Sequence, residues 1–170
     1  LLAVQGLEEL VDECDTKGWA QSDIPLMVRV HLRLGLWNRE LSEQYTTYSD
    51  EQEPATPSEM NGPQILKKQE DDDAKMRYVA ESLRNFEKCT KLDPNYYKGW
   101  HHWAMINFEM VEDMKASFAK LQEKTESPSY ERKYSQTDFK NHIRKAANGF
   151  FKSIVLGRAR SKSNVLQDIL

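Results

Sequence analysis

Histidine and cysteine are the side chains of this sequence best suited to chemistry, but their spacing does not suggest a metal site. His101 and His102 are adjacent, so on a helix they would point about 100° apart and could not readily share an ion. His31 falls on an apolar stripe, where a core histidine is expected. The sequence contains no His-x-x-x-His and no Cys-x-x-Cys pair, so no metal site is predicted.

Motifs for catalysis are also missing from the sequence. It lacks the Gly-x-Ser-x-Gly elbow of hydrolases and the glycine-rich loops that bind nucleotide phosphates. Cys14 has no basic neighbours in the sequence that would activate its thiol. Cys14 and Cys89 are expected to be two reduced, buried thiols of a cytosolic or nuclear protein, and the chain by itself is predicted to contain no catalytic residues.

Charge is unevenly distributed along the 170 residues, although the net charge is only −3. Residues 1–73 carry 16 acidic and 6 basic side chains, whereas residues 131–170 carry 3 acidic and 9 basic ones. The basic helix near the C-terminus could bind a phosphoinositide or nucleic acid. The negative net charge and the lack of a recognised motif argue against nucleic acid. No apolar run approaches the roughly 18 residues that predict a transmembrane segment.

Apolar residues recur at helical spacing through most of the chain, without the alternation typical of strands. Gly18 and Gly35 are expected to end helices. Asp23, followed by Pro25, predicts the start of a helix. The apolar stripes run over residues 2–14, 27–34, 37–48, 76–90, 97–118 and 139–156.

Three further helix starts are predicted from capping residues. Asp93 is expected to be an N-cap, with Pro94 in the first turn of the helix that follows. Thr137-Asp138 is expected to cap the basic helix, and Ser163-Asn164 to begin one more helix.

Two stretches lack helical periodicity. Residues 49–73 are rich in acidic residues and proline, which predicts a mobile acidic insertion. Residues 125–136 predict a second linker. The Asp93-Pro94 join resembles the start of a tetratricopeptide (TPR) repeat, but only one good copy is found. We therefore predict an all-α fold over residues 1–170, with antiparallel helix pairs in a degenerate TPR/HEAT-like α-solenoid.

Four motifs in order resemble the FAT domain of target-of-rapamycin kinases, a family of phosphatidylinositol-3-kinase-related kinases. They are Leu-Arg-Leu-Gly-Leu-Trp at 32–37, Trp-His-His-Trp-Ala-Met-Ile-Asn-Phe-Glu at 100–109, Gly-Phe-Phe-Lys-Ser-Ile at 149–154, and Asn-Val-Leu-Gln-Asp-Ile-Leu at 164–170. The structural-motif residues are Trp37, Trp100, Trp103, Asn107, Phe108, Gly149, Phe150 and Phe151 from these motifs, with Asp93 and Pro94 from the TPR-like join.

This resemblance implies a fragment of a large Ser/Thr protein kinase whose kinase domain lies beyond Leu170. The fragment would wrap and restrain that kinase domain and offer surfaces to regulatory subunits. It implies a cytoplasmic protein that can reach endomembrane surfaces or the nucleus through its complexes. Some family members hold inositol hexakisphosphate, and here Lys98 would contact it, with Lys133 and Arg132 as co-ligands. A free-standing TPR-like adaptor that binds a peptide is the alternative.

Overall fold

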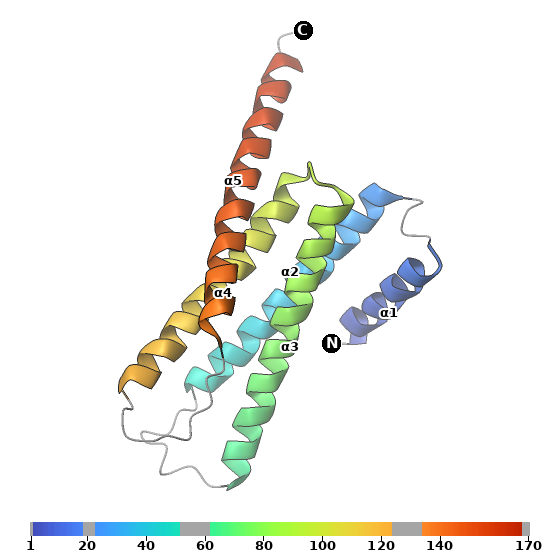
Figure 1. Cartoon of the computed structure of the whole chain (residues 1–170). Coiled ribbons are helices and arrows are strands. Elements are labelled where there is room, and N and C mark those ends of the chain that lie inside the picture. The colour runs from blue at the N-terminus through green and yellow to red at the C-terminus, as the bar shows by residue number, and fades with distance from the viewer. Residues whose placement is uncertain (1, 19–22, 52–61, 124–133, 168–170) are drawn as a thin grey trace. The chain divides into compact units, whose positions relative to one another are not determined.

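The computed structural model describes residues 2–18, 23–51, 62–123 and 134–167, and Figure 1 shows their arrangement. Within these ranges the regular elements are all α-helices and no strand occurs, so the predicted all-α fold is confirmed. The chain divides into two compact units, residues 1–93 and 94–170. The helices are α1 (Leu2–Thr16), α2 (Ile24–Glu51) and α3 (Gly62–Leu92) in the first unit, and α4 (Tyr97–Glu123) and α5 (Gln136–Gln167) in the second.

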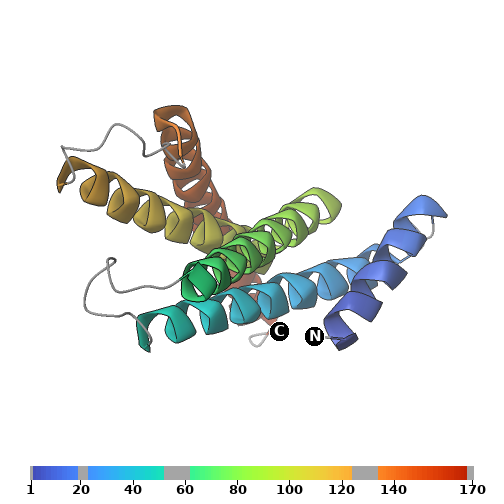
Figure 2. The ribbon, with the colours of Figure 1, turned by 90° about the horizontal axis from the view of Figure 1, so that it is seen from below.

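In the first unit, α2 and α3 form an antiparallel hairpin and lie side by side in both views (Figures 1 and 2). Near one end, the Cys89 thiol donates to the carbonyl of Val28 at 3.4 Å. Near the other, the rings of Tyr45 and Tyr78 stack at 5.7 Å between centroids. Burial raises the pKa of the Cys89 thiol to about 12, so this thiol stays protonated and unreactive.

Gly35 lies at a close contact between α2 and α3, and it does not end a helix as predicted. Helix α2 runs through it without a break. A Cβ atom at this position would lie 2.5 Å from Cε1 of Phe86, whose side chain is fully buried. Ser82 donates its hydroxyl to the carbonyl of Gly35 at 2.9 Å. The missing side chain therefore allows the two helices to pack closely.

Helix α1 packs on α2 through a small apolar cluster. Val11 is buried there with Met27 and Leu34. Helix α1 ends at Thr16, and Gly18 follows with a φ of 71°, a left-handed conformation that glycine adopts readily. The predicted start of α2 is also confirmed, because the carboxylate of Asp23 accepts a hydrogen bond from the Leu26 N–H at 3.0 Å.

The second unit repeats this design with α4 and α5. A Cβ atom at Gly149 of α5 would lie 2.8 Å from Cβ of Ala104 and 3.1 Å from the Trp103 ring. The rings of Phe118 and Phe139 meet edge to face at 5.7 Å. Since position 104 faces 149 and position 118 faces 139, these two helices are also antiparallel. Each unit therefore contains one hairpin that closes around a glycine.

Each hairpin also contains a histidine–asparagine pair that joins its two helices. Nδ1 of His31 lies 2.9 Å from Oδ1 of Asn85, and Nδ1 of His142 lies 2.8 Å from Oδ1 of Asn107. Both asparagines donate Nδ2 to the carbonyl four residues earlier, so Oδ1 is the acceptor and the histidine Nδ1 carries the hydrogen. Burial, followed by the charge of Lys145, lowers the pKa of His142.

The prediction of an acidic insertion over 49–73 is wrong at both ends. Residues 49–51 end α2, and residues 62–73 form the first turns of α3. Residues 52–61 lie outside the described residues. Once the packed part of α3 has formed, adding turns to it costs little, even for polar residues. Gln69 adds a local bond there by donating to the carboxylate of Asp73 at 3.0 Å.

The prediction that Asp93 is the N-cap of the next helix is also wrong. Helix α3 ends at Leu92, the Asp93 N–H donates to the carbonyl of Cys89, and α4 begins only at Tyr97. Asp93 and Pro94 therefore belong to a turn. The Trp100 indole N–H closes this turn by donating to the carbonyl of Pro94 at 2.8 Å.

The start of α5 is formed by Ser135 and Asp138, not by Thr137-Asp138. The Asp138 N–H donates to the Ser135 hydroxyl oxygen at 3.1 Å, and the Ser135 hydroxyl donates to the Asp138 carboxylate at 2.6 Å. This reciprocal arrangement is a capping box, and it lowers the pKa of Asp138. The predicted helix start at Ser163-Asn164 is wrong, because α5 is continuous to Gln167. Residues 125–133 of the predicted linker 125–136 lie outside the described residues.

Gly35 and Gly149 mark the two close helix contacts, which we call the glycine crossings. Adding a single methyl group at either position should cause a large loss of stability. Gly35→Ala and Gly149→Ala should each lower the free energy of unfolding by ~1–3 kcal/mol, because a Cβ atom would overlap packed neighbours. Urea unfolding of the 170-residue chain measures the change.

Gly6 and Gly157 are the matched controls, because a Cβ atom would meet nothing within 4 Å at Gly6 and only an ordinary contact of 3.9 Å at Gly157. Alanine at these two helical positions should be neutral or stabilise the chain by up to ~1 kcal/mol. A Gly35→Ala or Gly149→Ala chain as stable as the controls would contradict close packing at these positions.

Candidate functional site

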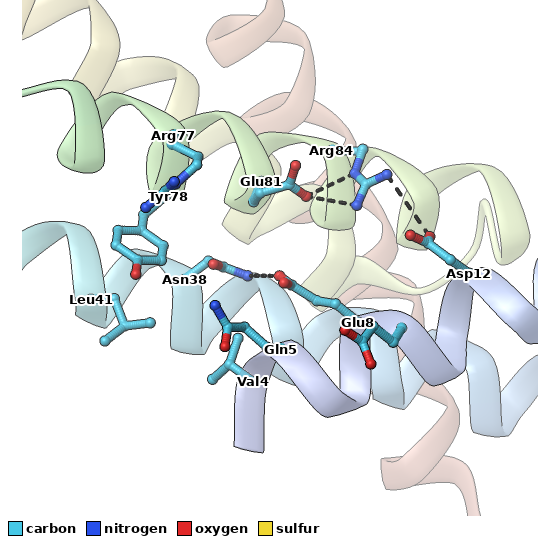
Figure 3. Close-up of a pocket in the computed structure, with 11 residues that line it drawn as sticks. Val4, Gln5, Glu8, Asp12, Asn38, Leu41, Arg77, Tyr78, Glu81 and Arg84 are labelled. Atoms are coloured by element: carbon cyan, nitrogen blue, oxygen red, sulfur yellow. Dashed lines mark hydrogen bonds and ion pairs between the residues drawn. The ribbon is translucent and has the colours of Figure 1, made fainter. Parts of the chain in front are cut away.

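A pocket of about 470 Å³ opens between α1, α2 and α3 of the first unit (Figure 3). Helix α1 forms one wall, and the other wall comes from the facing sides of α2 and α3. The side chains that line it are mostly polar: Val4, Gln5, Glu8, Glu9, Asp12, Asn38, Leu41, Arg77, Tyr78, Glu81 and Arg84.

The charges in this pocket are mixed, with four carboxylates and two guanidinium groups. Arg84 pairs with Glu81 of its own helix at 2.7 Å and lies 4.0 Å from the carboxylate of Asp12 on α1. These groups are about half exposed, so the contact between α1 and α3 adds little stability. The pocket has a net negative charge and could receive a basic side chain.

Asn38 provides the stronger link between α1 and the hairpin. Its side chain is almost fully buried, and Nδ2 donates to the Glu8 carboxylate at 2.8 Å and to the Leu34 carbonyl at 3.1 Å. Both amide hydrogens are therefore bonded. A hydrogen bond to a charged acceptor at a partly buried site is stronger than an exposed ion pair.

The pocket lining combines carboxylates and guanidinium groups with two amides and one phenol, and it contains no histidine, cysteine, serine or threonine. Across the described residues, no group of three or more His, Cys, Asp or Glu side chains is arranged to hold a metal ion. Sequence reasoning did not identify this pocket, because its lining comes from three helices that no local pattern relates.

The polyphosphate site inferred from the family resemblance falls at the start of α4. Lys98 is exposed in the first turn of this helix. Lys133 and Arg132, its expected co-ligands, lie outside the described residues. The structure adds Lys152 of α5, whose ammonium group sits 3.9 Å from the centre of the Trp100 ring. Sequence reasoning counted Lys152 only as part of the basic helix.

The family-motif residues have two different environments. Trp103 and Asn107 are packed between α4 and α5, where Trp103 meets Gly149 and Asn107 meets His142. In the first unit, Trp37 packs beside the α1–α2 cluster, with a guanidinium group 5.4 Å from the centre of its ring.

Two other motif residues are exposed instead. Phe108 has 46% of its surface accessible and Phe151 has 70%. Between them in sequence, the Phe150 ring is partly buried and lies 6.4 Å from that of Phe108. Packing inside the hairpin therefore accounts for only part of the motif.

The Asn38–Glu8 bond predicts that Glu8→Ala will loosen α1. The loss should be ~1–2 kcal/mol in the free energy of unfolding, because a nearly buried amide loses its charged acceptor. Glu9→Ala is the control, since Glu9 lies next to Glu8 and is exposed. Urea unfolding of both variants measures the difference, and equal effects would show that the Asn38 bond contributes nothing specific.

Among the described residues, no helix is both long and apolar enough to cross a bilayer.

Comparison with known proteins identifies the family. The sequence profile of the FAT domain matches residues 5–170. The Drosophila melanogaster serine/threonine-protein kinase mTor is 30% identical over 154 residues, which cover 88% of this chain. Kinases TOR2 of Saccharomyces cerevisiae and tor1 of Schizosaccharomyces pombe are 31% and 37% identical over 52% and 53% of the chain. No solved structure gives a significant match.

The aligned region is a small part of these relatives. It covers 5%, 4% and 3% of the fly, budding-yeast and fission-yeast proteins, respectively. The profile nevertheless spans nearly the whole of this chain, and the resemblance seen in its four motifs is confirmed. The chain is a FAT segment of the target-of-rapamycin type and belongs to the FAT domain family.

Proposed function

We propose that this chain is a regulatory and scaffolding segment of a target-of-rapamycin-type Ser/Thr protein kinase. The observation that carries the proposal is the FAT domain match over residues 5–170. The relatives are named as serine/threonine-protein kinases, which supports a kinase as the parent protein. The kinase domain itself belongs to another part of that parent.

In this proposal the segment acts by shape and rigidity. Each hairpin closes around a glycine and is joined by a histidine–asparagine pair, so each can move as a unit. A rigid segment that wraps a kinase domain restrains it by contacting one of its conformations better than another. The outer faces of the helices are then available to regulatory subunits, and the parent complex works in the cytoplasm and on endomembranes.

The test is the kinase activity of the full-length parent carrying Gly149→Ala. If the segment restrains the kinase domain, loosening the α4–α5 hairpin should raise basal phosphorylation of a protein substrate several-fold, or release regulatory subunits during purification. Gly157→Ala on the same helix is the control and should change neither. Unchanged activity and subunit composition in a Gly149→Ala parent with a weakened hairpin would contradict the proposal.

We further propose that Lys98 contacts an inositol polyphosphate. The support is its exposed position in the first turn of α4, where the free N–H groups of a helix start favour an anion. Lys152 supplies a second cation from α5, beside Trp100 two residues after Lys98. Phosphate groups bind best where several such donors converge.

Calorimetry with inositol hexakisphosphate at physiological salt tests this second proposal on the 170-residue chain. Lys98→Ala should weaken binding by about tenfold or more, the usual effect of losing a charge-assisted hydrogen bond. Lys115→Ala, which removes an equal charge later in α4, should have no such effect. Weak binding that falls with salt and is equally affected by both changes would indicate only a general attraction to basic residues.

A further inference from the structure

The outward side of α5 carries a row of exposed apolar side chains. Phe151 is 70% exposed, Ile154 54%, Val155 49% and Ile143 43%. Together with Ala147, these residues form what we call the α5 stripe. Positions 143, 147, 151 and 154 follow one another at intervals of four, four and three residues, so they lie along one side of the helix for about three turns.

The opposite side of α5 is the one that packs on α4. Ala146, Gly149 and Ser153 are buried there. Phe108 of α4 adds a further exposed ring beside the α5 stripe, through its contact with Phe150 at 6.4 Å. The hairpin is therefore complete without the α5 stripe, and burial inside this unit does not explain its apolar residues. Contiguous exposed apolar surface of this kind typically marks an interface.

Basic side chains flank the α5 stripe. Lys140 and Arg144 lie along its first part and Arg158 along its last, and all three are exposed. The described part of α5 has one acidic residue, Asp138, whose carboxylate is engaged by Ser135. Charge complementarity therefore favours a partner that places negative charge beside the α5 stripe.

We propose that the α5 stripe is the binding site for an acidic amphipathic α-helix from another part of the parent polypeptide. The three-to-four-residue spacing suits a second helix, whose side chains would pack between those of the α5 stripe. Stacked helical pairs bury their outer faces against neighbouring pairs. The 154 aligned residues cover only 5% of the fly relative, so a parent of similar length has ample chain to supply the helix. The inference rests on the proposed function, because it requires a longer parent.

The direct test places a photo-crosslinking residue in the full-length parent. With p-benzoylphenylalanine at position 151, irradiation followed by mass spectrometry should give a crosslink within the same polypeptide. The captured peptide should have apolar residues at helical spacing and a net negative charge. The control is the same residue at position 145, which is exposed on α5 about 120° around the helix from position 151 and should not capture this peptide.

Several results would overturn the proposal. They are a crosslink from position 151 to lipid, to a second copy of the parent or to a separate subunit, and the absence of any crosslink specific to that position. The result is independent of the kinase assay above. If an acidic helix is captured but Gly149→Ala leaves the activity of the parent unchanged, restraint of the kinase domain is contradicted. The proposal for the α5 stripe would still hold.

A peptide experiment on the 170-residue chain tests the charge requirement separately. The probe is a 20-residue synthetic helix with leucine at every third or fourth position and glutamate on both flanks, and the comparison peptide carries lysine instead. The glutamate peptide should bind at least tenfold more tightly, and Ile154→Ser should weaken it at least tenfold. Equal binding of both peptides, or no effect of Ile154→Ser, would overturn the proposal.

Discussion

The close approach of paired helices at Gly35 and Gly149 is the constraint on which the rest of the structure depends. At each position a single methyl group would fall within 3 Å of a neighbouring side chain. Because the helices are so close, Phe86 is fully buried and the Ser82 hydroxyl can reach a backbone carbonyl on the facing helix. Well-packed interiors tolerate little added volume, so these two positions fix the spacing of both hairpins.

The polar pairs between the helices depend on the same spacing. His31 and Asn85 meet in the first hairpin, and Asn107 and His142 meet in the second, at 2.9 and 2.8 Å. In one hairpin the histidine is on the earlier helix, and in the other it is on the later one. A buried hydrogen bond between two specific side chains selects one register of a helix pair, because a shifted register would leave polar groups unpaired. Two hairpins, each held in one register by such a pair, suit the regulatory and scaffolding role proposed for this segment.

The sequence predicted those features that rest on local patterns or on family motifs. The helical spacing identified the all-α fold, and the Asp23 cap marked the start of α2 correctly. Gly35 was misread as a helix end, because only the tertiary contact with Phe86 explains a glycine inside a helix. The helical start of α3 was missed, since acidic residues that look like a loop can extend a helix already held by packing.

The candidate surfaces were harder to predict. The pocket beside Asn38 is formed by three helices, and the bond to Glu8 crosses 30 residues of sequence. The apolar pattern of α5 included the buried Ala146 but also the exposed Phe151 and Ile154, because periodicity could not distinguish the side that packs on α4 from the side occupied by Phe151. A helix that is apolar on two sides requires the structure to show which side already has a neighbour.

Native-state hydrogen exchange of the 170-residue chain tests the central claim most directly. If the glycine crossings hold the hairpins together, the slowest-exchanging amides should cluster around Gly35 and Phe86 in one unit, and around Ala104 and Gly149 in the other. Residues 66–73 of α3, which lack this packing, should exchange much faster. Protection that is highest in residues 66–73, or that shows no maximum at the two crossings, would contradict the account.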